Sequence, residues 1–415
     1  MSKKKSKVVN LGCRLNFFES EIIKNIHEKK NIENQIVINT CAVTNQAVRK
    51  SIYEVRKASK EYPDYKIIVT GCASQIDKDA FQGLENVFRV VDNKEKTQPE
   101  VYMGQKINNH DIFKIPFSEN FTSIRTRAML QIQQGCDHRC TFCIIPFGRG
   151  SSKSLPFDEI SKRVRKILDD GYHEIILTGV DLTSYGKDLP GRPRLGNVLK
   201  RLFKIQPELK RLRLSSIDPA EIDDDLFELL VNENRILPHL HLSLQSGDNL
   251  ILKRMKRRHT REEVIRICNE IKSSRPEFTF GADVIVGFPT EKEEQFYNTV
   301  QLIRICDFSN IHIFPYSSKK GTPASRMPQV NEKIKRERVE ILRKQSKEIL
   351  FKQLNSKIGK SVTILFESNK KSYTDNYYKV KIMKSKQNKI EKSGSVIDVK
   401  LVSRRGDLLL AQFKE

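Results

Sequence analysis

The chain has 415 residues, 38% of them hydrophobic and 30% charged, and its formal net charge is +24. This composition excludes a disordered chain and leaves room for two or three folded domains. No apolar run approaches the roughly 18 residues of a membrane helix, and the basic start is followed by too short an apolar stretch for a signal peptide. We therefore expect a cytoplasmic protein with no membrane partner.

The basic excess and the cysteines both bear on function. Lys and Arg displace counterions from phosphate backbones, so a charge of +24 favours a nucleic-acid partner. The alternative is an A/T-rich genome that places Lys at every solvated position. Eight cysteines in 415 residues do not make a disulfide scaffold, and in a reducing compartment a group of cysteines more often binds metal or takes part in chemistry.

Short apolar strands alternate with amphipathic helical stretches over residues 1–92. Alternation of this kind predicts a parallel sheet covered by helices, that is, a doubly wound α/β domain. The predicted strands are 7–11, 35–39, 66–70 and 88–91, and the predicted helices are 19–30 and 47–60.

Three cysteines follow three of these strands at the same relative position. Cys13, Cys41 and Cys72 each lie one or two residues beyond the C-terminal end of a strand. That edge of a parallel sheet is where ligands bind, and neighbouring strands are only ~4.8 Å apart. The pattern predicts that the three thiols converge on one cluster. Coincidence is the alternative, because a single buried cysteine at a strand end is ordinary.

A polar stretch at 93–121 is expected to be a linker, and strand-like and helix-like segments alternate after it. Six such units predict a partial (β/α)6 barrel whose active site lies at the C-terminal ends of its strands. The strands are expected at 129–133, 174–179, 211–215, 239–244, 278–286 and 310–314, and the helices at 157–170, 194–205, 223–232, 260–273 and 292–305.

The most informative stretch follows the first barrel strand. Cys136, Cys140 and Cys143 form a C-x3-C-x2-C motif, and thiolates bind iron–sulfur clusters, zinc or copper(I). Three ligands on one loop can hold three corners of a [4Fe–4S] cluster and leave the fourth iron open. Structural zinc is the alternative, but it needs four ligands. With Phe142 before the third cysteine, the motif resembles that of the radical S-adenosylmethionine (SAM) enzymes, in which the open iron binds SAM and the reduced cluster cleaves it to a radical.

Polar or small residues suited to a cofactor follow the barrel strands. Any one of them could simply end a strand at a turn. As a ring around the cysteine loop they are better explained as a SAM pocket, with Asp181 as the acid nearest the cofactor. The ring comprises Gly179, Asp181, Ser215, Ser216, Gln245 and Val286.

Other polar groups have less specific patterns. Residues 253–259 include five basic residues and a histidine beside the predicted pocket, which suits either a phosphate-binding rim or a solvated helix end. Cys268 and Cys306 lie in amphipathic helices and are expected to be core residues. The histidines at 173, 239, 241 and 312 lie in or beside strands and are expected to be structural.

The C-terminal region, which follows a charged helical segment at 331–351, has a different character. Residues 351–415 contain 15 basic and 6 acidic residues and alternate apolar and polar positions in four or five short strands. They predict a small β-barrel. Basic strands interleaved with Tyr373, Tyr377 and Tyr378 resemble the RNA-binding faces of OB-like barrels, although an ordinary basic accessory domain is the alternative.

The order of these three regions resembles the methylthiotransferase family of radical SAM enzymes over essentially the whole chain. The family's motifs are matched at 12–16, 39–45, 70–73, 283–289, 314–317 and 373–377. The resemblance implies a methylthiotransferase domain at 1–118, a radical SAM domain at 122–350 and a TRAM RNA-binding domain at 351–415. Thr290 and Ser372 depart from the family, which usually or often has Gly at these positions.

The resemblance also implies cofactors and chemistry. One SAM would methylate a sulfur on an auxiliary cluster, and a radical from a second SAM would remove the hydrogen from C2 of an adenine in tRNA. An external donor would supply the electron, and no catalytic residue is expected beyond the cluster ligands. The implied ligands are Cys136, Cys140 and Cys143 for the SAM-cleaving [4Fe–4S] cluster and Cys13, Cys41 and Cys72 for the auxiliary [4Fe–4S] cluster.

Within the family, the segment at 39–45 is most similar to the MtaB branch, which methylthiolates N6-threonylcarbamoyladenosine at position 37 of the tRNA anticodon stem-loop. Sister branches act on isopentenyladenosine in tRNA (MiaB) or on an aspartate of a ribosomal protein (RimO). A non-enzymatic, metal-stabilised RNA-binding protein is the alternative of a different class. The open fourth ligand position and the ring of strand-end residues argue against it.

Overall fold

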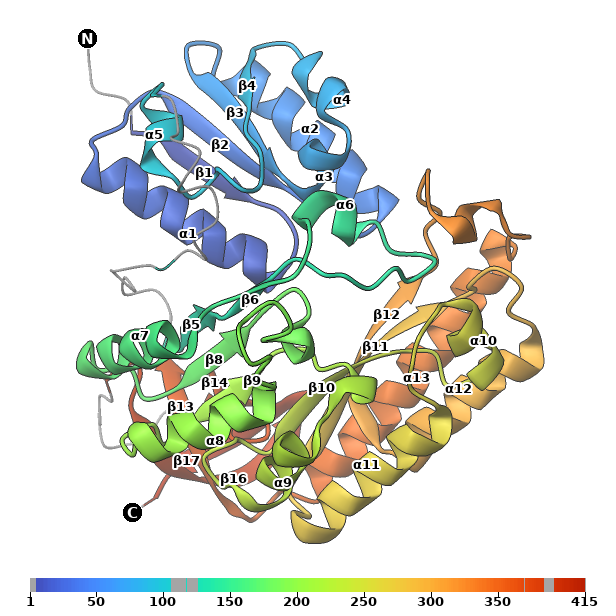
Figure 1. Cartoon of the computed structure of the whole chain (residues 1–415). Helices are drawn as coiled ribbons and strands as arrows, with labels where there is room; N and C mark the ends of the chain where they lie inside the picture. The colour runs from blue at the N-terminus through green and yellow to red at the C-terminus, as the bar shows by residue number, and fades with distance from the viewer. Residues whose placement is uncertain (1–4, 106–116, 118–125, 369, 384–391, 415) are drawn as a thin grey trace.

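The computed structural model describes residues 5–105, 117, 126–368, 370–383 and 392–414. Its N-terminal part is a parallel four-stranded sheet in the order β1-β2-β3-β4 (Figure 1). Apolar residues alternate along the strands, so that Val37 packs with α1 and Ile38 packs with α2 on the other face. Helices on both faces confirm the predicted α/β domain. The elements are β1 (Lys7–Asn10), α1 (Arg14–Lys29), β2 (Gln35–Thr40), α2 (Asn45–Glu61), β3 (Lys66–Gly71), α3 (Cys72–Ile76), α4 (Lys78–Gln82) and β4 (Val87–Val90).

The predicted linker at 93–121 is only partly described, and the described part is not irregular throughout. It contains a short helix, α5 (Pro99–Tyr102), whose Val101 and Tyr102 are 2% and 3% exposed. These side chains pack with the apolar face of α1. The expectation of a wholly irregular linker was therefore wrong for this segment, because two apolar residues in a polar stretch are enough to dock one helical turn.

The central part has two parallel three-stranded sheets, β5-β8-β9 and β10-β11-β12. An isolated parallel bridge between Ile217 and Leu242 links them, so the six strands form the predicted partial barrel. Helices cover its outer surface (Figure 1). The principal elements are β5 (Ala128–Gln131), α7 (Phe157–Asp169), β8 (Ile175–Thr178), α8 (Leu195–Ile205), β9 (Leu212–Leu214), α9 (Asp224–Asn232), β10 (His239–Gln245), α11 (Arg261–Ser274), β11 (Thr279–Val286), α12 (Glu293–Ile305) and β12 (Phe308–Pro315).

Shorter elements shape the loops at the strand ends. The cysteine loop lies between β6 and α6, and several single turns follow the later strands. These elements are β6 (Gln133–Gln134), α6 (Ile145–Arg149), β7 (Lys153–Ser154), η2 (Leu182–Ser184), η3 (Pro219–Glu221), α10 (Asn249–Arg254) and η4 (Pro323–Arg326).

Burial along β10 alternates with a period of two. Leu240, Leu242 and Leu244 are at most 1% exposed and belong to the large core that also holds residues of the outer helices. Successive side chains of a strand point to opposite faces. His239 and His241 therefore lie on the concave face of the barrel.

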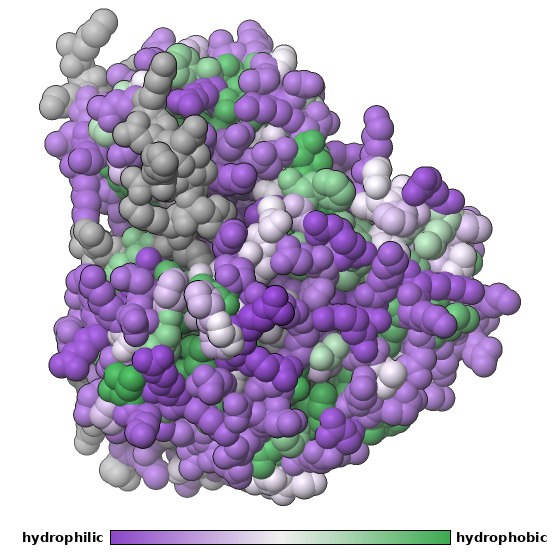
Figure 2. Space-filling model, viewed as in Figure 1, coloured by the Kyte–Doolittle hydropathy of each residue, from purple (hydrophilic) through white to green (hydrophobic). Residues whose placement is uncertain are grey.

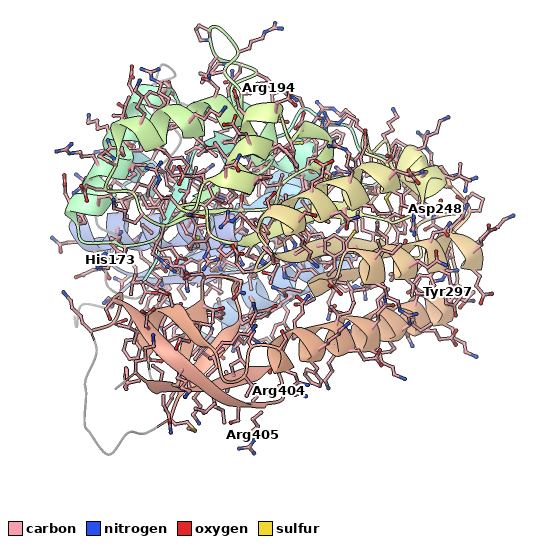
Figure 3. All side chains as sticks on the ribbon, turned by 90° about the horizontal axis from the view of Figure 1, so that it is seen from below. His173, Arg194, Asp248, Tyr297, Arg404 and Arg405 are labelled. Atoms are coloured by element: carbon pink, nitrogen blue, oxygen red, sulfur yellow. The ribbon has the colours of Figure 1, made fainter. Side chains whose placement is uncertain are left out.

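The C-terminal part is a closed five-stranded barrel in the order β13-β14-β15-β17-β16, as predicted. Helix α13 leads into it, and Arg404 of the barrel donates to Asn355 at the end of this helix (Figure 3). Arg213 donates to the carbonyls of Thr374 and Asp375, which docks the barrel on the central part. The elements are α13 (Glu332–Asn355), β13 (Ser361–Ser368), β14 (Lys371–Thr374), β15 (Lys379–Ile382), β16 (Val396–Arg405) and β17 (Leu408–Phe413).

The face of the molecule in Figure 2 is largely hydrophilic, with apolar side chains in scattered patches. None of the helices in the described ranges combines the length and the apolar character needed to cross a bilayer.

A buried carboxylate joins the central part to the C-terminal barrel. Glu174 is 0% exposed and lies within 2.6 to 2.8 Å of Arg127, Arg211 and Arg213. Arg127 also pairs with Glu367 of β13. Burial alone would raise the pKa of Glu174, but attraction to the three guanidinium groups outweighs it and lowers the pKa from 4.5 to about 2.

We expect Glu174→Gln to destabilise the protein by roughly 3 kcal/mol at neutral pH, the free energy that corresponds to this shift. Because the folded-state pKa is depressed, the contribution is present above pH 4.5 and is lost as pH falls through about 2. Denaturant unfolding at several pH values measures this. The stability of the variant should converge with that of the wild type in acid, and a constant gap between the two curves would contradict the assignment.

Candidate active site between two groups of cysteines

The structure brings Cys13, Cys41 and Cys72 together at one edge of the N-terminal sheet. Cys13 immediately precedes α1, Cys41 follows β2 and Cys72 begins α3. Burial, together with the neighbouring charges of Cys13 and Cys72, raises the pKa of the Cys41 thiol to about 11. Gly12 has a φ of +106° and packs on Cys41, where an added Cβ would lie 2.8 Å from the sulfur. We call these three residues the N-terminal triad.

A buried network of charges lies behind the N-terminal triad. Arg149 donates from Nε to the Cys72 sulfur at 3.1 Å and from Nη2 to Glu19 at 3.0 Å. Glu19 also pairs with Lys96 at 2.6 Å. All three charged residues are at most 4% exposed. Sequence reasoning missed this network, although Glu19 interrupts the apolar stripe of α1 and so gave a signal.

Cys136, Cys140 and Cys143 lie on one loop between β6 and α6, and we call them the loop triad. Their charges act on one another, since Cys143 raises the pKa of Cys136 and Cys140 raises that of Cys143. Burial is the larger cause and brings the pKa of Cys143 to about 11. Thr141 fastens the loop, because its hydroxyl donates to the carbonyl of Arg254 at 2.8 Å and its own carbonyl accepts from Ala324 at 2.9 Å.

Asp181, predicted as the acid nearest the cofactor, lies beside the loop triad. It accepts from the Cys136 thiol at 3.5 Å and from Ser184 at 2.7 Å, and it pairs with His138 at 3.0 Å. The hydrogen bonds to Asp181 and Glu221 raise the pKa of His138 to about 9. This part of the site therefore places an imidazole between two carboxylates.

The basic run at 253–259 is partly turned inward. Arg257 and Arg258 both pair with Asp218, at 3.0 and 2.9 Å, and Arg257 also approaches the Cys140 sulfur at 3.8 Å. Lys253, Lys256 and Arg258 remain exposed. The predicted phosphate-binding rim thus has these three side chains available, while Arg257 and its carboxylate partner support the cysteine loop.

The remaining residues of the predicted ring differ in what they offer a ligand. The Ser215 hydroxyl is buried without a hydrogen-bond partner in the described part of the chain. Gln245 is partly exposed at a φ of +69°. Val286 is 1% exposed in the core, so only its backbone is available.

Three further residues of the prediction lie around this edge. Gly179 packs on Gln133, where an added Cβ would be 2.8 Å from Oε1. The ring of Phe142 packs edge-on against Phe288 at 6.5 Å between centroids. Ser216 is partly exposed.

These donors fit an iron–sulfur cluster and a polar cofactor. Three soft thiols share each site, and a thiol with a raised pKa binds metal by giving up its proton. The orphaned Ser215 hydroxyl is a buried polar group at the strand edge that still needs a partner.

Helix α6 connects the loop triad to the N-terminal triad. This helix begins two residues after Cys143 and ends at Arg149, which donates to Cys72. An added Cβ on Gly148 would lie 3.4 Å from the Cys72 Cβ. The loop triad and the N-terminal triad therefore border one region of the molecule, a relation that their separation in the sequence does not reveal.

Comparison with known proteins agrees with this arrangement. Models of the radical SAM superfamily and of "Uncharacterized protein family UPF0004" match residues 130–303 and 5–92. The chain is 46% identical over 391 residues to a threonylcarbamoyladenosine tRNA methylthiotransferase, MtaB, of Rickettsia prowazekii, covering 92% of each protein. The chain belongs to the MtaB branch of the radical SAM methylthiotransferases.

Two further similarities place this MtaB-type chain among its relatives. It is 33% identical to a tRNA-2-methylthio-N(6)-dimethylallyladenosine synthase of Fusobacterium nucleatum, covering 98% of the chain and 95% of that protein. A solved structure of the radical SAM methyltransferase TsrM from Kitasatospora setae matches with a TM-score of 0.53 at 14% identity, over 75% of this chain and 68% of that one. The TsrM match supports the fold alone.

Thr290, which departs from the family's usual Gly, has an unusual backbone conformation in this MtaB-type chain. Its φ is +71°, the left-handed region that favours glycine. Arg254 donates to the Thr290 hydroxyl at 2.7 Å, a bond that a glycine would not make. Thr290 therefore gains a hydrogen bond in exchange for a strained backbone conformation.

Proposed function

We propose that this protein adds a methylthio group to C2 of N6-threonylcarbamoyladenosine at position 37 of tRNA. The proposal is supported by the 46% identity to a curated threonylcarbamoyladenosine tRNA methylthiotransferase. The single structural observation that carries it is that α6, which follows one three-thiol group, packs against Cys72 of the other, because this reaction needs both SAM cleavage and a source of sulfur.

Each group of residues has a role in this proposal. Cys136, Cys140 and Cys143 hold a SAM-cleaving [4Fe–4S] cluster, and Cys13, Cys41 and Cys72 hold a second one. Bound SAM and the clusters supply the radical, the methyl group and the sulfur, chemistry that no side-chain base can perform on an aromatic C–H bond. The chain itself binds and orients these groups. The proposed SAM contacts are Phe142, Gly179, Asp181, Ser215, Ser216, Gln245 and the backbone of Val286.

Arg149 and Arg257 are the cations placed beside the two groups of thiols. Each guanidinium approaches a cysteine sulfur, Cys72 at 3.1 Å and Cys140 at 3.8 Å. Positive charge at these positions stabilises the thiolate form that a cluster requires. We therefore assign both arginines to holding negative charge at the cysteine sulfurs.

The remaining parts of the chain are assigned to the tRNA. We propose domains at 1–118, 122–350 and 351–415, the last being a TRAM domain that contacts the anticodon stem-loop. A formal net charge of +24 supports a polyanionic partner. An external donor supplies the electron, and the cytoplasm provides the tRNA and a reducing environment for the thiols.

Nucleoside mass spectrometry of tRNA from a deletion strain tests the substrate. We expect loss of the methylthio group from threonylcarbamoyladenosine, with the unmethylthiolated nucleoside accumulating, and its return on complementation. If the methylthio group is lost from dimethylallyladenosine instead, the chain has the activity of the sister branch. Anaerobically purified protein should contain about eight irons, as two [4Fe–4S] clusters require. Zinc without iron would favour a metal-stabilised RNA-binding protein.

A further inference from the structure

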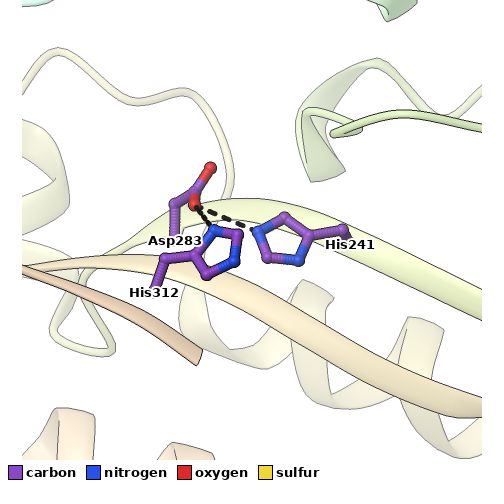
Figure 4. A group of neighbouring side chains, drawn as sticks. All are labelled: His241, Asp283 and His312. Carbon is purple, nitrogen blue, oxygen red and sulfur yellow. Dashed lines mark hydrogen bonds and ion pairs between the residues drawn. The ribbon is translucent and has the colours of Figure 1, made fainter. Parts of the chain in front are cut away.

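A group of three polar side chains lies on the concave face of the barrel, away from both cysteine triads in the sequence. His241 of β10, Asp283 of β11 and His312 of β12 come from three neighbouring strands (Figure 4). His241 Nε2 and His312 Nδ1 each lie 3.0 Å from the same oxygen, Oδ1 of Asp283. We call these residues the histidine–aspartate trio. The sequence predicted only structural roles for the two histidines.

The trio has one nitrogen available to a ligand. His312 is 54% exposed, and no hydrogen bond reaches its Nε2 from the described residues. Nδ1 of His241 lies against Gly281, where an added Cβ would be only 2.6 Å away. Asp283 is 23% exposed, and its Oδ1 accepts both imidazoles. His312 Nε2 is therefore the nitrogen of the trio that is exposed to a ligand. Asp283 and His241 hold the His312 ring in place.

The trio faces the region that the N-terminal triad borders. Arg14, the residue after Cys13, donates to the Tyr377 hydroxyl at 3.2 Å. Tyr377 stacks on His239 at 5.2 Å between ring centroids, two residues before His241 on β10. Burial lowers the pKa of His239, and the nearby Arg14 lowers it as well. The Cys13 end of α1 and the trio thus share one side of the barrel.

Asp283 controls what the outward nitrogen can do. Burial alone would raise the pKa of Asp283, but hydrogen bonds from His241 and His312 outweigh it and hold the pKa below its ordinary value. A hydrogen on each ring nitrogen lets His312 donate from Nδ1 to Asp283 and from Nε2 to a ligand. Such a ring binds a carboxylate or another strong acceptor, and an apolar group in its place would leave the donor unpaired.

The proposed substrate offers a matching group. The threonylcarbamoyl substituent on N6 carries a carboxylate and a hydroxyl, whereas the dimethylallyl substituent of the sister enzymes' substrate is a hydrocarbon. We propose that His312, held by Asp283 and His241, binds the carboxylate of the threonylcarbamoyl group and so makes the enzyme select this substituent. This inference rests on the proposed function and names the residue that would set its specificity.

The test compares substrates that differ in the N6 substituent and its charge. Anticodon stem-loops carrying threonylcarbamoyladenosine, its neutral carboxyl methyl ester or dimethylallyladenosine are offered to the wild type and to His312→Ala. We expect the wild type to prefer the free acid over the ester by about 10- to 100-fold in kcat/KM, the range for a hydrogen bond to a charged group. In the variant this ratio should fall close to one, with iron content unchanged.

Two controls keep the result specific. Asn310→Ala removes an exposed side chain two residues earlier on the same face of β12 and should keep the preference for the acid. His312→Gln retains a donor and should recover part of the preference if His312→Ala folds poorly.

Three outcomes would overturn the inference. If His312→Ala keeps the full preference for the free acid, only this inference is overturned. The proposed function would stand, because the wild type would still methylthiolate the free acid. Failure of the wild type on the free acid would overturn the proposed function as well. The three ligand atoms also lie within 4.8 Å of one another, as in a metal site. One equivalent of zinc or iron beyond the clusters, lost in His312→Ala, would replace carboxylate binding with metal binding.

Discussion

Changing Cys41 to Ala should abolish methylthio transfer while leaving SAM cleavage largely intact. Cys41 is 6% exposed at the centre of the N-terminal triad, between Cys13 and Cys72 in chain order. Its loss leaves two thiols for the second cluster and does not touch the loop triad. We expect transfer to fall by more than about 100-fold, above the range for losing a residue that only supports a ligand. Iron should fall from about eight to about four per chain.

The measurement pairs two products from the same anaerobic reaction. Formation of 5′-deoxyadenosine reports SAM cleavage, and mass spectrometry of the tRNA nucleosides reports transfer. Cys268→Ala is the matched control, since Cys268 is a 0% exposed cysteine of the barrel core. It should keep about eight irons and both activities. Transfer at wild-type rates in the Cys41 variant would remove the N-terminal triad from the reaction.

The sequence was sufficient where local pattern determines geometry. Strand periodicity placed the six barrel strands and the C-terminal barrel, because alternating apolar residues must face a core. The same pattern predicted that Cys13, Cys41 and Cys72 meet, since parallel strands end at one edge. Cys268 and Cys306, expected in the core, are 0% and 1% exposed.

The sequence was insufficient where partners come from distant segments. Nothing local indicates that Arg149 reaches back to Glu19, or that Arg257 and Arg258 turn inward to Asp218. A run of basic residues looks the same whether it meets solvent or buried carboxylates. His241 and His312 likewise gave no sign that Asp283 lies between them, because pairing across strands depends on register.

Glu19→Ala should destabilise the protein by roughly 3–5 kcal/mol, the cost of leaving a buried charge without its partner. Glu19 is 2% exposed and is shared by Arg149 and Lys96, which are 4% and 0% exposed. Burial alone would raise the pKa of Glu19, but attraction to these two cations outweighs it and lowers the pKa. Removing the carboxylate leaves two cations in an apolar environment, and Arg149 loses the anchor that directs it to Cys72.

Glu21→Ala provides the matched control on the same helix. Glu21 pairs with Lys24 at 2.7 Å, but the two side chains are 22% and 41% exposed, so its loss should cost less than about 1 kcal/mol. Denaturant unfolding of the metal-free proteins compares the two variants without a contribution from cluster binding. Equal losses of stability in the two variants would mean that solvent reaches Glu19. The charge network would then not fix Arg149 beside the N-terminal triad. If Glu19→Ala loses much stability and Glu21→Ala does not, the buried carboxylate of Glu19 holds α6 against the N-terminal sheet. Helix α6 follows the loop triad, and this sheet carries the N-terminal triad.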